Sequence, residues 1–165
     1  MDYLCAEQAI KFFDDNSIPY SIKYHVCDAL TCIDVARERG VKLSQVLKCM
    51  VGKGIDGIIY VMLIPGDKIV NIDKLRYAVG IKVNLLPSKE LTSNFGLKIG
   101  AISPIQFVNM TKNGNVHFLL DRTVLNEESI DISAGTLNAG IQLKTNDLVS
   151  LINPTICDIV EAKNV

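Results

Sequence analysis

Two apolar runs of strand length, separated by a short glycine-rich segment, constrain the fold of this chain more than any other feature. The runs are residues 45–51 and 58–64, and residues 52–57 between them read GKGIDG. The three glycines match the pattern G-x-G-x-x-G, but a dinucleotide site needs a helix to begin at that point. The following run is instead β-branched and aromatic, which favours a strand. We therefore predict a hairpin between two strands and reject a nucleotide cofactor.

Elsewhere in the chain, helix and strand patterns alternate. Apolar residues recur every three or four positions from Tyr3 to Phe13, which predicts a first helix. Thr31 followed by Asp34 predicts the N-cap of a second helix, and Arg37 and Arg39 before Gly40 are typical of its C-terminal end. Further helices are expected at residues 71–79, after Pro87, and from a cap at Thr145 to residue 152; further strands are expected at residues 20–25, 82–86, 106–109, 116–120, 129–133, 141–143 and 155–160.

This order of elements predicts a single domain over residues 1–165 of the mixed α+β (α/β) class. No repeat or low-complexity linker divides the chain, and 165 residues are enough for one hydrophobic core. Because helices and strands interleave without strict βαβ alternation, we expect a mixed, barrel-like β-sheet surrounded by helices. The longest apolar run, residues 58–65, is too short to cross a membrane, and the N-terminus has no signal-peptide pattern. A cytoplasmic protein is expected.

The cysteines and histidines predict neither a disulfide framework, a metal site nor a nucleophilic triad. Five cysteines occur at irregular spacings without a CxxC pair, which is typical of reduced thiols. Cys27 and Cys32 lie near His25, but their spacing fits no standard zinc pattern. His117 lies in an apolar strand, and no G-x-S-x-G motif is present. We expect no metal, no cofactor and no Ser-His-Asp relay.

The charges are unevenly distributed along the chain, although the net charge is only −1. Residues 37–98 carry eleven Lys and Arg against five Asp and Glu. A basic segment can present a surface for a polyanion, because phosphates respond to the local potential. Solvated outer faces of strands and helices explain the same lysines equally well. Composition alone leaves both interpretations open.

Lys48 is the most unusual charged residue, because it lies inside the apolar run 45–51. A lysine in a largely buried strand must reach water or a polar partner. One interpretation is a side chain that extends from the edge of a sheet to solvent. The other is an ammonium group that points into a cleft, where it can hold a phosphate or polarise an ester.

A stiff loop, Gly100-Ala101-Ile102-Ser103-Pro104, is the second candidate feature. Glycine allows backbone angles that other residues avoid, and proline fixes one angle. Such a loop can direct several N–H groups at a cleft, where they would stabilise negative charge on a carbonyl oxygen. An ordinary tight connection is the alternative interpretation.

Together these segments resemble the YbaK and prolyl-tRNA-synthetase-insertion-like aminoacyl-tRNA deacylases. The similarity runs from about residue 20 to residue 152. It includes the strand that ends at His25, the capped helix after Thr31, the sequence QVLK that ends at Lys48, the PGD turn at residues 65–67, the Gly-x-x-x-Pro loop, residues 116–121, the sequence ISAG that ends at Gly135, GIQL at residues 140–143, and the helix that contains Asp147.

The resemblance implies a barrel-like sheet surrounded by helices and a free-standing enzyme that acts in trans. It implies hydrolysis of a wrong amino acid from the 3′ acceptor end of a tRNA, without a metal or a protein nucleophile. By this analogy Lys48 positions the terminal adenosine or the ester, residues 100–104 hold the carbonyl, and water attacks. His25, Thr31 and Gly135 are further substrate-binding residues by the same analogy.

The resemblance leaves the substrate open. A prolyl-type tRNA that carries a small wrong amino acid is the expected substrate, and a synthetase is a further partner to consider. Cys49 and residues 136–139 depart from the usual family pattern. A non-catalytic module that binds a tRNA end or a synthetase through the same fold is the alternative function.

Overall fold

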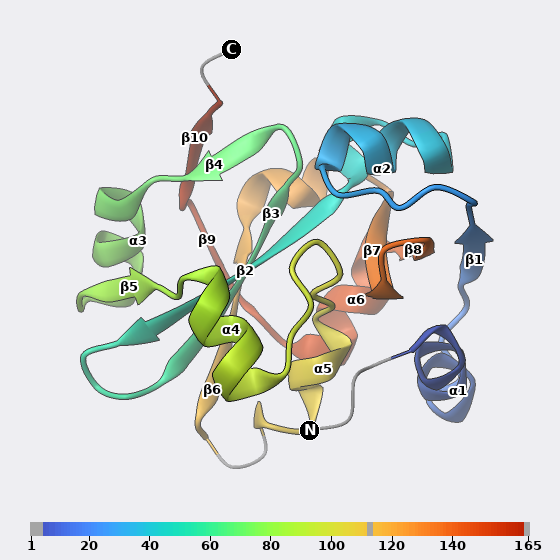
Figure 1. Ribbon diagram of the computed structural model, residues 1–165. Helices are drawn as coiled ribbons and strands as arrows, with labels where there is room; N and C mark the ends of the chain where they lie inside the picture. Colours follow the sequence, from blue (N-terminus) through green and yellow to red (C-terminus); the bar gives the residue numbers. More distant parts are fainter. Residues whose placement is uncertain (1–4, 112–113, 164–165) are drawn as a thin grey trace.

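A computed structural model describes residues 5–111 and 114–163 of the chain. Tyr3, the first residue of the predicted N-terminal helix, lies outside this range. The elements along the chain are α1 (Ala6–Asp15), β1 (Ser21–Tyr24), α2 (Cys32–Arg39), η1 (Leu43–Gln45), β2 (Leu47–Gly54), β3 (Ile59–Pro65), β4 (Lys68–Val70), α3 (Ile72–Val79), β5 (Val83–Leu85), α4 (Ser88–Phe95), α5 (Ile105–Val108), β6 (Val116–Asp121), η3 (Arg122–Asn126), β7 (Ser129–Thr136), β8 (Ala139–Lys144), α6 (Thr145–Ile152), β9 (Thr155–Cys157) and β10 (Val160–Ala162) (Figure 1).

The glycine-rich segment joins β2 and β3 as an antiparallel hairpin, which confirms the prediction. Leu47 pairs with Pro65 at one end of the hairpin and Lys53 with Ile59 at the other. Gly57 has a φ of 85°, a left-handed conformation that the turn requires and that glycine adopts without strain. Every residue of β3 is buried. This strand lies between β2 and β6, which explains why its sequence is apolar throughout.

The strands form three sheets. The largest has the order β5-β2-β3-β6-β9, in which β6 runs parallel to both β3 and β9 while the other pairs are antiparallel. A three-stranded antiparallel sheet has the order β1-β8-β7, and β10 pairs with β4. An isolated parallel bridge between Val46 and Asp131 connects the start of β2 to β7. The mixed α+β class is confirmed, whereas closure into a barrel stays a prediction.

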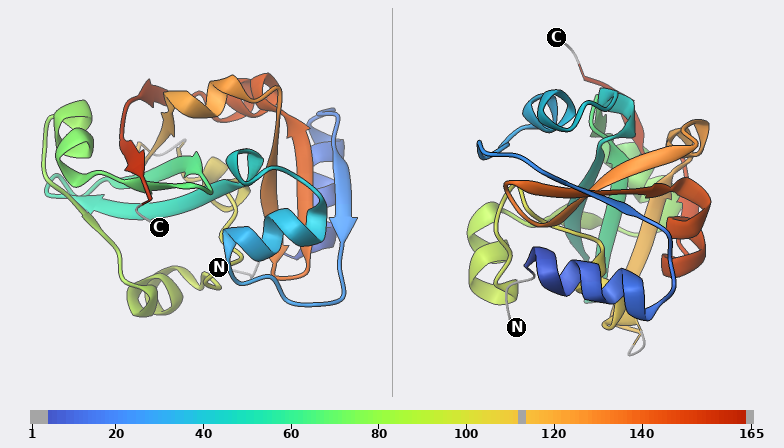
Figure 2. Two further views of the ribbon diagram at one scale, coloured as in Figure 1. Left: turned by 90° about the horizontal axis from the view of Figure 1, so that it is seen from above. Right: turned by 90° about the vertical axis from the view of Figure 1, so that its right-hand side faces the viewer.

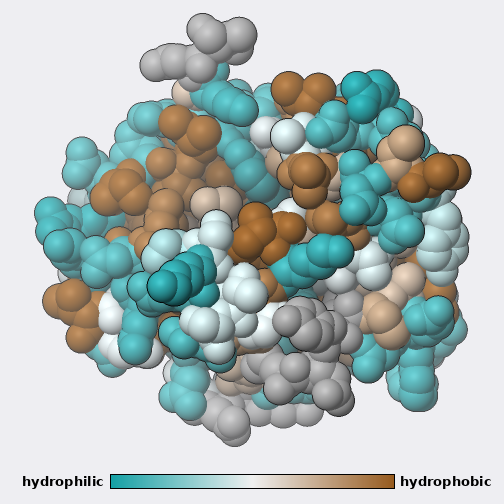
Figure 3. Space-filling view, in the orientation of Figure 1, coloured by the Kyte–Doolittle hydropathy of each residue, from teal (hydrophilic) through white to brown (hydrophobic). Residues whose placement is uncertain are grey.

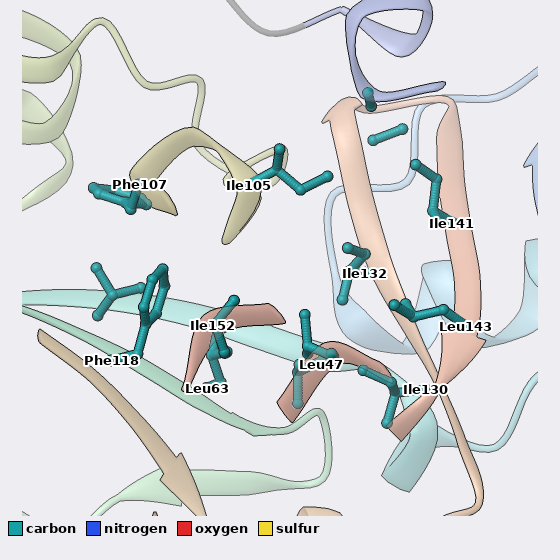
Figure 4. Packing of buried hydrophobic residues seen from close by; sticks show 14 of the residues in the cluster. Leu47, Leu63, Ile105, Phe107, Phe118, Ile130, Ile132, Ile141, Leu143 and Ile152 are labelled. Atoms are coloured by element: carbon teal, nitrogen blue, oxygen red, sulfur yellow. The ribbon is translucent and has the colours of Figure 1, made fainter. Parts of the chain in front are cut away.

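The helices cover both faces of the three-stranded sheet. Figure 2 shows α1 on one face of β1, β8 and β7, and α2 on the other. The main core fills the space between this sheet and the five-stranded sheet. Its side chains come from α1, β2, β3, α4, α5, β6, η3, β7, β8 and α6. Those labelled in Figure 4 point into a common interior: Leu47, Leu63, Ile105, Phe107, Phe118, Ile130, Ile132, Ile141, Leu143 and Ile152.

Three sequence predictions of local structure are wrong. Residues 106–109 do not form a strand, because α5 occupies Ile105–Val108. Here Pro104 is already helical, and the side-chain oxygen of Gln106 accepts from the Ser103 amide, as at many helix starts. Ile105 and Phe107 are buried while Gln106 is half-buried, so a single helical turn imitates the alternation of a strand.

The other two differences concern the C-terminal third of the chain. The expected strand at residues 155–160 is divided into β9 and β10, which belong to different sheets. Thr145 is the first residue of α6 rather than its cap, and its hydroxyl donates to the carbonyl oxygen of Glu127. Within the residues described, no helix is both long enough and apolar enough to span a membrane.

Candidate functional site

A cavity of about 680 Å³ opens between α2, β2, α4 and the loop that follows α4. Most of its wall is apolar, and Leu30, Ile33 and Ile99 form an exposed apolar rim. Figure 3 shows apolar side chains in the middle of this face of the molecule, between α2 and α4. The polar and charged residues of the wall are Thr31, Cys32, Arg39, Lys48, Cys49, Asp67, Ser88, Asp131, Ser133 and Lys163.

The cavity follows an edge of β2 that its neighbouring strand leaves uncovered. β5 pairs with β2 only over Gly52–Gly54, and the Leu86 amide donates to the Val51 carbonyl oxygen just beyond. All of residues 46–51 line the cavity. Backbone groups at such an edge are available to a ligand, because strand pairing does not use them.

Lys48 is one of the residues that line this cavity. Its ammonium group donates to the Lys68 carbonyl oxygen at 2.5 Å, and its side chain is half-buried. Burial lowers the pKa of Lys48, and the nearby Lys163 adds to this effect, whereas Cys32 and Asp67 oppose it. The ammonium group is therefore held by one backbone carbonyl and keeps donors for a ligand.

The thiols at the cavity are not activated as nucleophiles. Burial raises the pKa of the Cys32 thiol, although Lys48 and Lys163 act in the opposite direction. Burial also raises the pKa of the Cys49 thiol. A thiol attacks as its thiolate, so both groups are poor nucleophiles at neutral pH. The five cysteines form no disulfide with one another, and only Cys157 is fully buried.

The predicted loop places alternate residues at the cavity. Gly100 and Ile102 line it, whereas Ala101, Ser103 and Pro104 are buried behind them. The Ala101 amide donates to the Lys98 carbonyl oxygen and the Ser103 amide to the Gln106 side chain. The amides of Gly100 and Ile102 have no hydrogen-bond partner among the described residues. Only these two amides of the loop are therefore available to a bound carbonyl oxygen.

Gly100 is required for the shape of this loop. Its φ of +83° lies in the left-handed region, where other residues are strained. A Cβ atom at this position would lie 2.9 Å from the Leu137 side chain. For both reasons, a larger residue at position 100 would distort the loop.

The remaining predicted site residues are less closely associated with the cavity. Thr31 lines its rim, but its hydroxyl accepts from the Asp34 amide and donates to the Asp34 carboxylate, which confirms the predicted cap. His25 lies behind the wall, where its Nε2 accepts from Arg39. Gly135 is not part of the wall, and its amide donates to the Ser133 hydroxyl. Their proposed contacts with substrate stay predictions.

Sequence reasoning missed a buried ion pair in the cavity wall. Arg39 is not a solvated cation at the end of α2, because its guanidinium group donates to Asp131 and both side chains are buried. The sequence contains one weak signal for the burial of these two side chains. Arg39 stands just before Gly40, and Asp131 stands between two isoleucines of β7. Over residues 5–111 and 114–163, no group of three His, Cys, Asp or Glu side chains could hold a metal ion.

Comparison with known proteins identifies relatives of the whole domain. The family described as "Aminoacyl-tRNA editing domain" matches residues 27–151. A proline–tRNA ligase of Thermosipho melanesiensis is 27% identical over 110 residues, which cover 58% of this chain and 19% of the ligase. The candidate Cys-tRNA(Pro)/Cys-tRNA(Cys) deacylase EbsC of Enterococcus faecalis is 28% identical over 155 residues, which cover 92% of this chain and 91% of EbsC. The chain thus spans about a fifth of the ligase but most of EbsC.

Solved structures share the fold. A hypothetical protein matches with a TM-score of 0.82 at 22% identity, covering 92% of this chain and 98% of its own. A candidate trans-editing enzyme for prolyl-tRNA synthetase matches with a TM-score of 0.79 at 18% identity, covering 95% and 98% respectively. The names of the family and of EbsC both denote aminoacyl-tRNA editing or deacylation, in agreement with the predicted class of enzyme. Since the family match covers most of the chain, this protein belongs to the aminoacyl-tRNA editing domain family.

Proposed function

We propose that this domain hydrolyses the ester bond of mischarged aminoacyl-tRNA. The observation that supports the proposal best is that Lys48, Gly100 and Ile102 line one cavity, and that the amides of the last two have no partner among the described residues. Its volume of about 680 Å³ is within the range of small-ligand sites and is large enough for an aminoacyl group together with its terminal nucleoside. The apolar wall and exposed apolar rim suit the flat face of a base.

The chemistry of the reaction follows from these groups. Water attacks the ester carbonyl carbon, the carbonyl oxygen gains negative charge, and the bond to the ribose oxygen then breaks, releasing the amino acid and the tRNA hydroxyl. In this proposal the amides of Gly100 and Ile102 stabilise the developing oxyanion. Lys48 orients the ester or the neighbouring phosphate through its ammonium group. No covalent intermediate on Cys32 or Cys49 is needed.

The finer proposal is a domain acting in trans on a prolyl-type tRNA that carries a small wrong amino acid. The names of EbsC and of the matched ligases support a prolyl-type tRNA as the substrate, since they refer to proline or to tRNA(Pro). EbsC also supports action in trans, because the match extends over 91% of that protein. The acceptor end is the part of the tRNA that fits a cavity of this size.

The test is a panel of mischarged and correctly charged tRNAs, each incubated with the purified protein under single-turnover conditions. We expect at least one mischarged tRNA to lose its amino acid well above the spontaneous rate, while the correctly charged tRNA with the same anticodon does not. Binding of the panel without hydrolysis of any member would contradict the enzyme and favour the non-catalytic module.

The loop supplies a prediction for the same assay. Gly100→Val should reduce the single-turnover rate by about 100-fold, the effect of losing one oxyanion donor, because a branched residue cannot keep the left-handed backbone that directs the two free amides. Pro104→Gly should reduce the rate less, by loosening the loop.

Gly80→Val is the matched control for the loop variants. Gly80 has a similar φ of +80° but ends α3, and it does not line the cavity. It should lose stability and keep the rate constant of the folded protein. Equal rates for folded Gly100→Val and Gly80→Val would contradict a carbonyl-binding role of the loop.

A further inference from the structure

The C-terminal part of the described chain supplies the cavity with a second lysine, which the proposed hydrolysis does not use. Lys163 directly follows β10, is exposed and lines the cavity together with Lys48. The family match ends at residue 151, so β9, β10 and Lys163 lie outside the part of the chain that identifies the family. The family match therefore assigns no role to this lysine.

The segment that leads to Lys163 is anchored to the rest of the domain. The Ile159 amide donates to the buried carboxylate of Asp121 at 2.8 Å. β10 pairs with β4 in antiparallel orientation, and Ala162 lies opposite Lys68 at the end of this pairing (Figure 1). Because the backbone is paired up to residue 162, the position of the next residue is restricted as well. Lys163 thus reaches the cavity from a fixed strand.

The same strand pairing brings Lys163 near Lys48. Nζ of Lys48 donates to the carbonyl oxygen of Lys68, and Lys68 is the partner of Ala162 across the two strands. Burial lowers the pKa of Lys48, and the like charge of Lys163 lowers it further. Lys48 and Lys163 therefore form a lysine pair in the cavity wall, in which the two positive charges repel each other.

The acidic residues of the wall do not neutralise the lysine pair. Asp131 forms its ion pair with Arg39, and Asp67 lies 3.7 Å from the ammonium group of Lys68. Asp67 opposes the repulsion within the pair, but it shares its charge with Lys68. Among the described residues, no carboxylate forms a salt bridge with either lysine of the pair. This part of the wall therefore carries excess positive charge and favours an anion.

A phosphate group matches this arrangement of donors. A phosphodiester carries a single negative charge on two non-bridging oxygens, and both can accept hydrogen bonds from ammonium groups. Lys48 keeps donors that the Lys68 carbonyl oxygen does not use, and the exposed Lys163 offers its own. In the proposed substrate, the ribose that bears the ester also carries a phosphate on its 5′ oxygen. This phosphate is the anion of the substrate nearest to the reacting ester.

We propose that Lys163 binds, together with Lys48, the phosphate group on the 5′ side of the esterified ribose. This inference rests on the proposed function. It assigns the ligand class as 3′-aminoacyl esters of a nucleotide, and it disfavours esters in which a neutral group replaces the phosphate. Lys163 contributes to binding rather than to the chemical step, because it holds a group that does not change during hydrolysis.

The test uses one mischarged tRNA with either its native terminal phosphodiester or a neutral methylphosphonate at the same position. Hydrolysis of the two forms is compared under single-turnover conditions, at protein concentrations below saturation. For the wild type we expect the native form to react about 10-fold faster, as for a hydrogen bond to a charged group. In Lys163→Gln this ratio should fall by about 3-fold, the contribution of an exposed charge pair.

Two further variants separate the role of Lys163 from general electrostatic attraction. Lys163→Arg keeps the positive charge and should retain most of the wild-type ratio. Lys144→Gln is the matched control, because Lys144 is also exposed but does not line the cavity. It removes the same charge from the protein and should leave the ratio unchanged. Circular dichroism confirms the folding of each variant.

The possible outcomes distinguish this inference from the proposed function. Equal rates for the two forms in the wild type, or a folded Lys163→Gln variant with the wild-type ratio, would overturn the inference and leave the deacylase intact. A loss of both rates by one factor keeps that ratio and has the same meaning, since Lys163 would then be only structural. A wild type that hydrolyses neither form would overturn the proposed function. Binding of amide-linked analogues of both forms then decides the inference, because their dissociation constants should show the same ratio of about 10-fold and the same fall in Lys163→Gln.

Discussion

Lys48→Ala is expected to reduce single-turnover deacylation of the best mischarged tRNA by about 100-fold or more. The variant removes a half-buried ammonium group from the cavity, and interactions of this kind with a developing charge contribute a few kcal/mol to catalysis. Lys48→Arg should also be impaired, because a planar guanidinium group cannot occupy the position against the Lys68 carbonyl oxygen in the same geometry. The measurement is the rate constant at saturating protein, with circular dichroism to confirm folding.

Lys53→Ala is the matched control for this prediction. Lys53 lies on the same strand but is exposed, and it does not line the cavity. Its removal should leave the rate unchanged and alter the free energy of unfolding by no more than about 0.5 kcal/mol. A folded Lys48→Ala protein with the rate of Lys53→Ala would show that Lys48 only extends to solvent from the sheet edge, and the proposal would then depend on the loop amides alone.

Arg39→Met is expected to lower the free energy of unfolding by about 3–5 kcal/mol, since it leaves the buried carboxylate of Asp131 without its partner. Urea denaturation at neutral pH measures this loss. Burial already raises the pKa of Asp131, and Arg39 is the main group that opposes the rise. Without Arg39 the folded protein binds the proton still more tightly, so the stability deficit of the variant should shrink as the pH falls and Asp131 becomes protonated.

Two variants control the stability prediction. Arg37→Met removes a neighbouring arginine of the same helix whose ion pairs are exposed, and it should change stability by less than about 0.5 kcal/mol. Arg39→Met combined with Asp131→Leu should regain most of the lost stability, because no buried charge is left unpaired. If Arg39→Met were as stable as Arg37→Met at neutral pH, the pair of Arg39 and Asp131 would not be buried in solution.

The local structure of the chain was largely predictable because it depends on nearby residues. The apolar runs and the glycines between them specify the β2–β3 hairpin, and Thr31, Asp34 and Gly40 specify both ends of α2, since turns and caps use contacts within a few residues. The order of motifs also predicted the family correctly. Local patterns were misleading at α5, where one turn of helix buries alternate residues as a strand does.

The contacts of the candidate site depend on residues that are far apart in the chain. Arg39 and Asp131 are separated by 92 positions, and neither residue's own neighbours indicate that they pair. The loop amides behave differently, because those of Ala101 and Ser103 are bonded to Lys98 and Gln106, only three residues away in the chain. What depends on distant residues is the cavity that Gly100 and Ile102 line together with β2 and α2. The sequence by itself therefore determined the hairpin, both ends of α2 and the family, because these follow from short-range rules. The tertiary structure alone decided which buried charges meet and which segments share one cavity, because these contacts form only when distant strands and helices pack together.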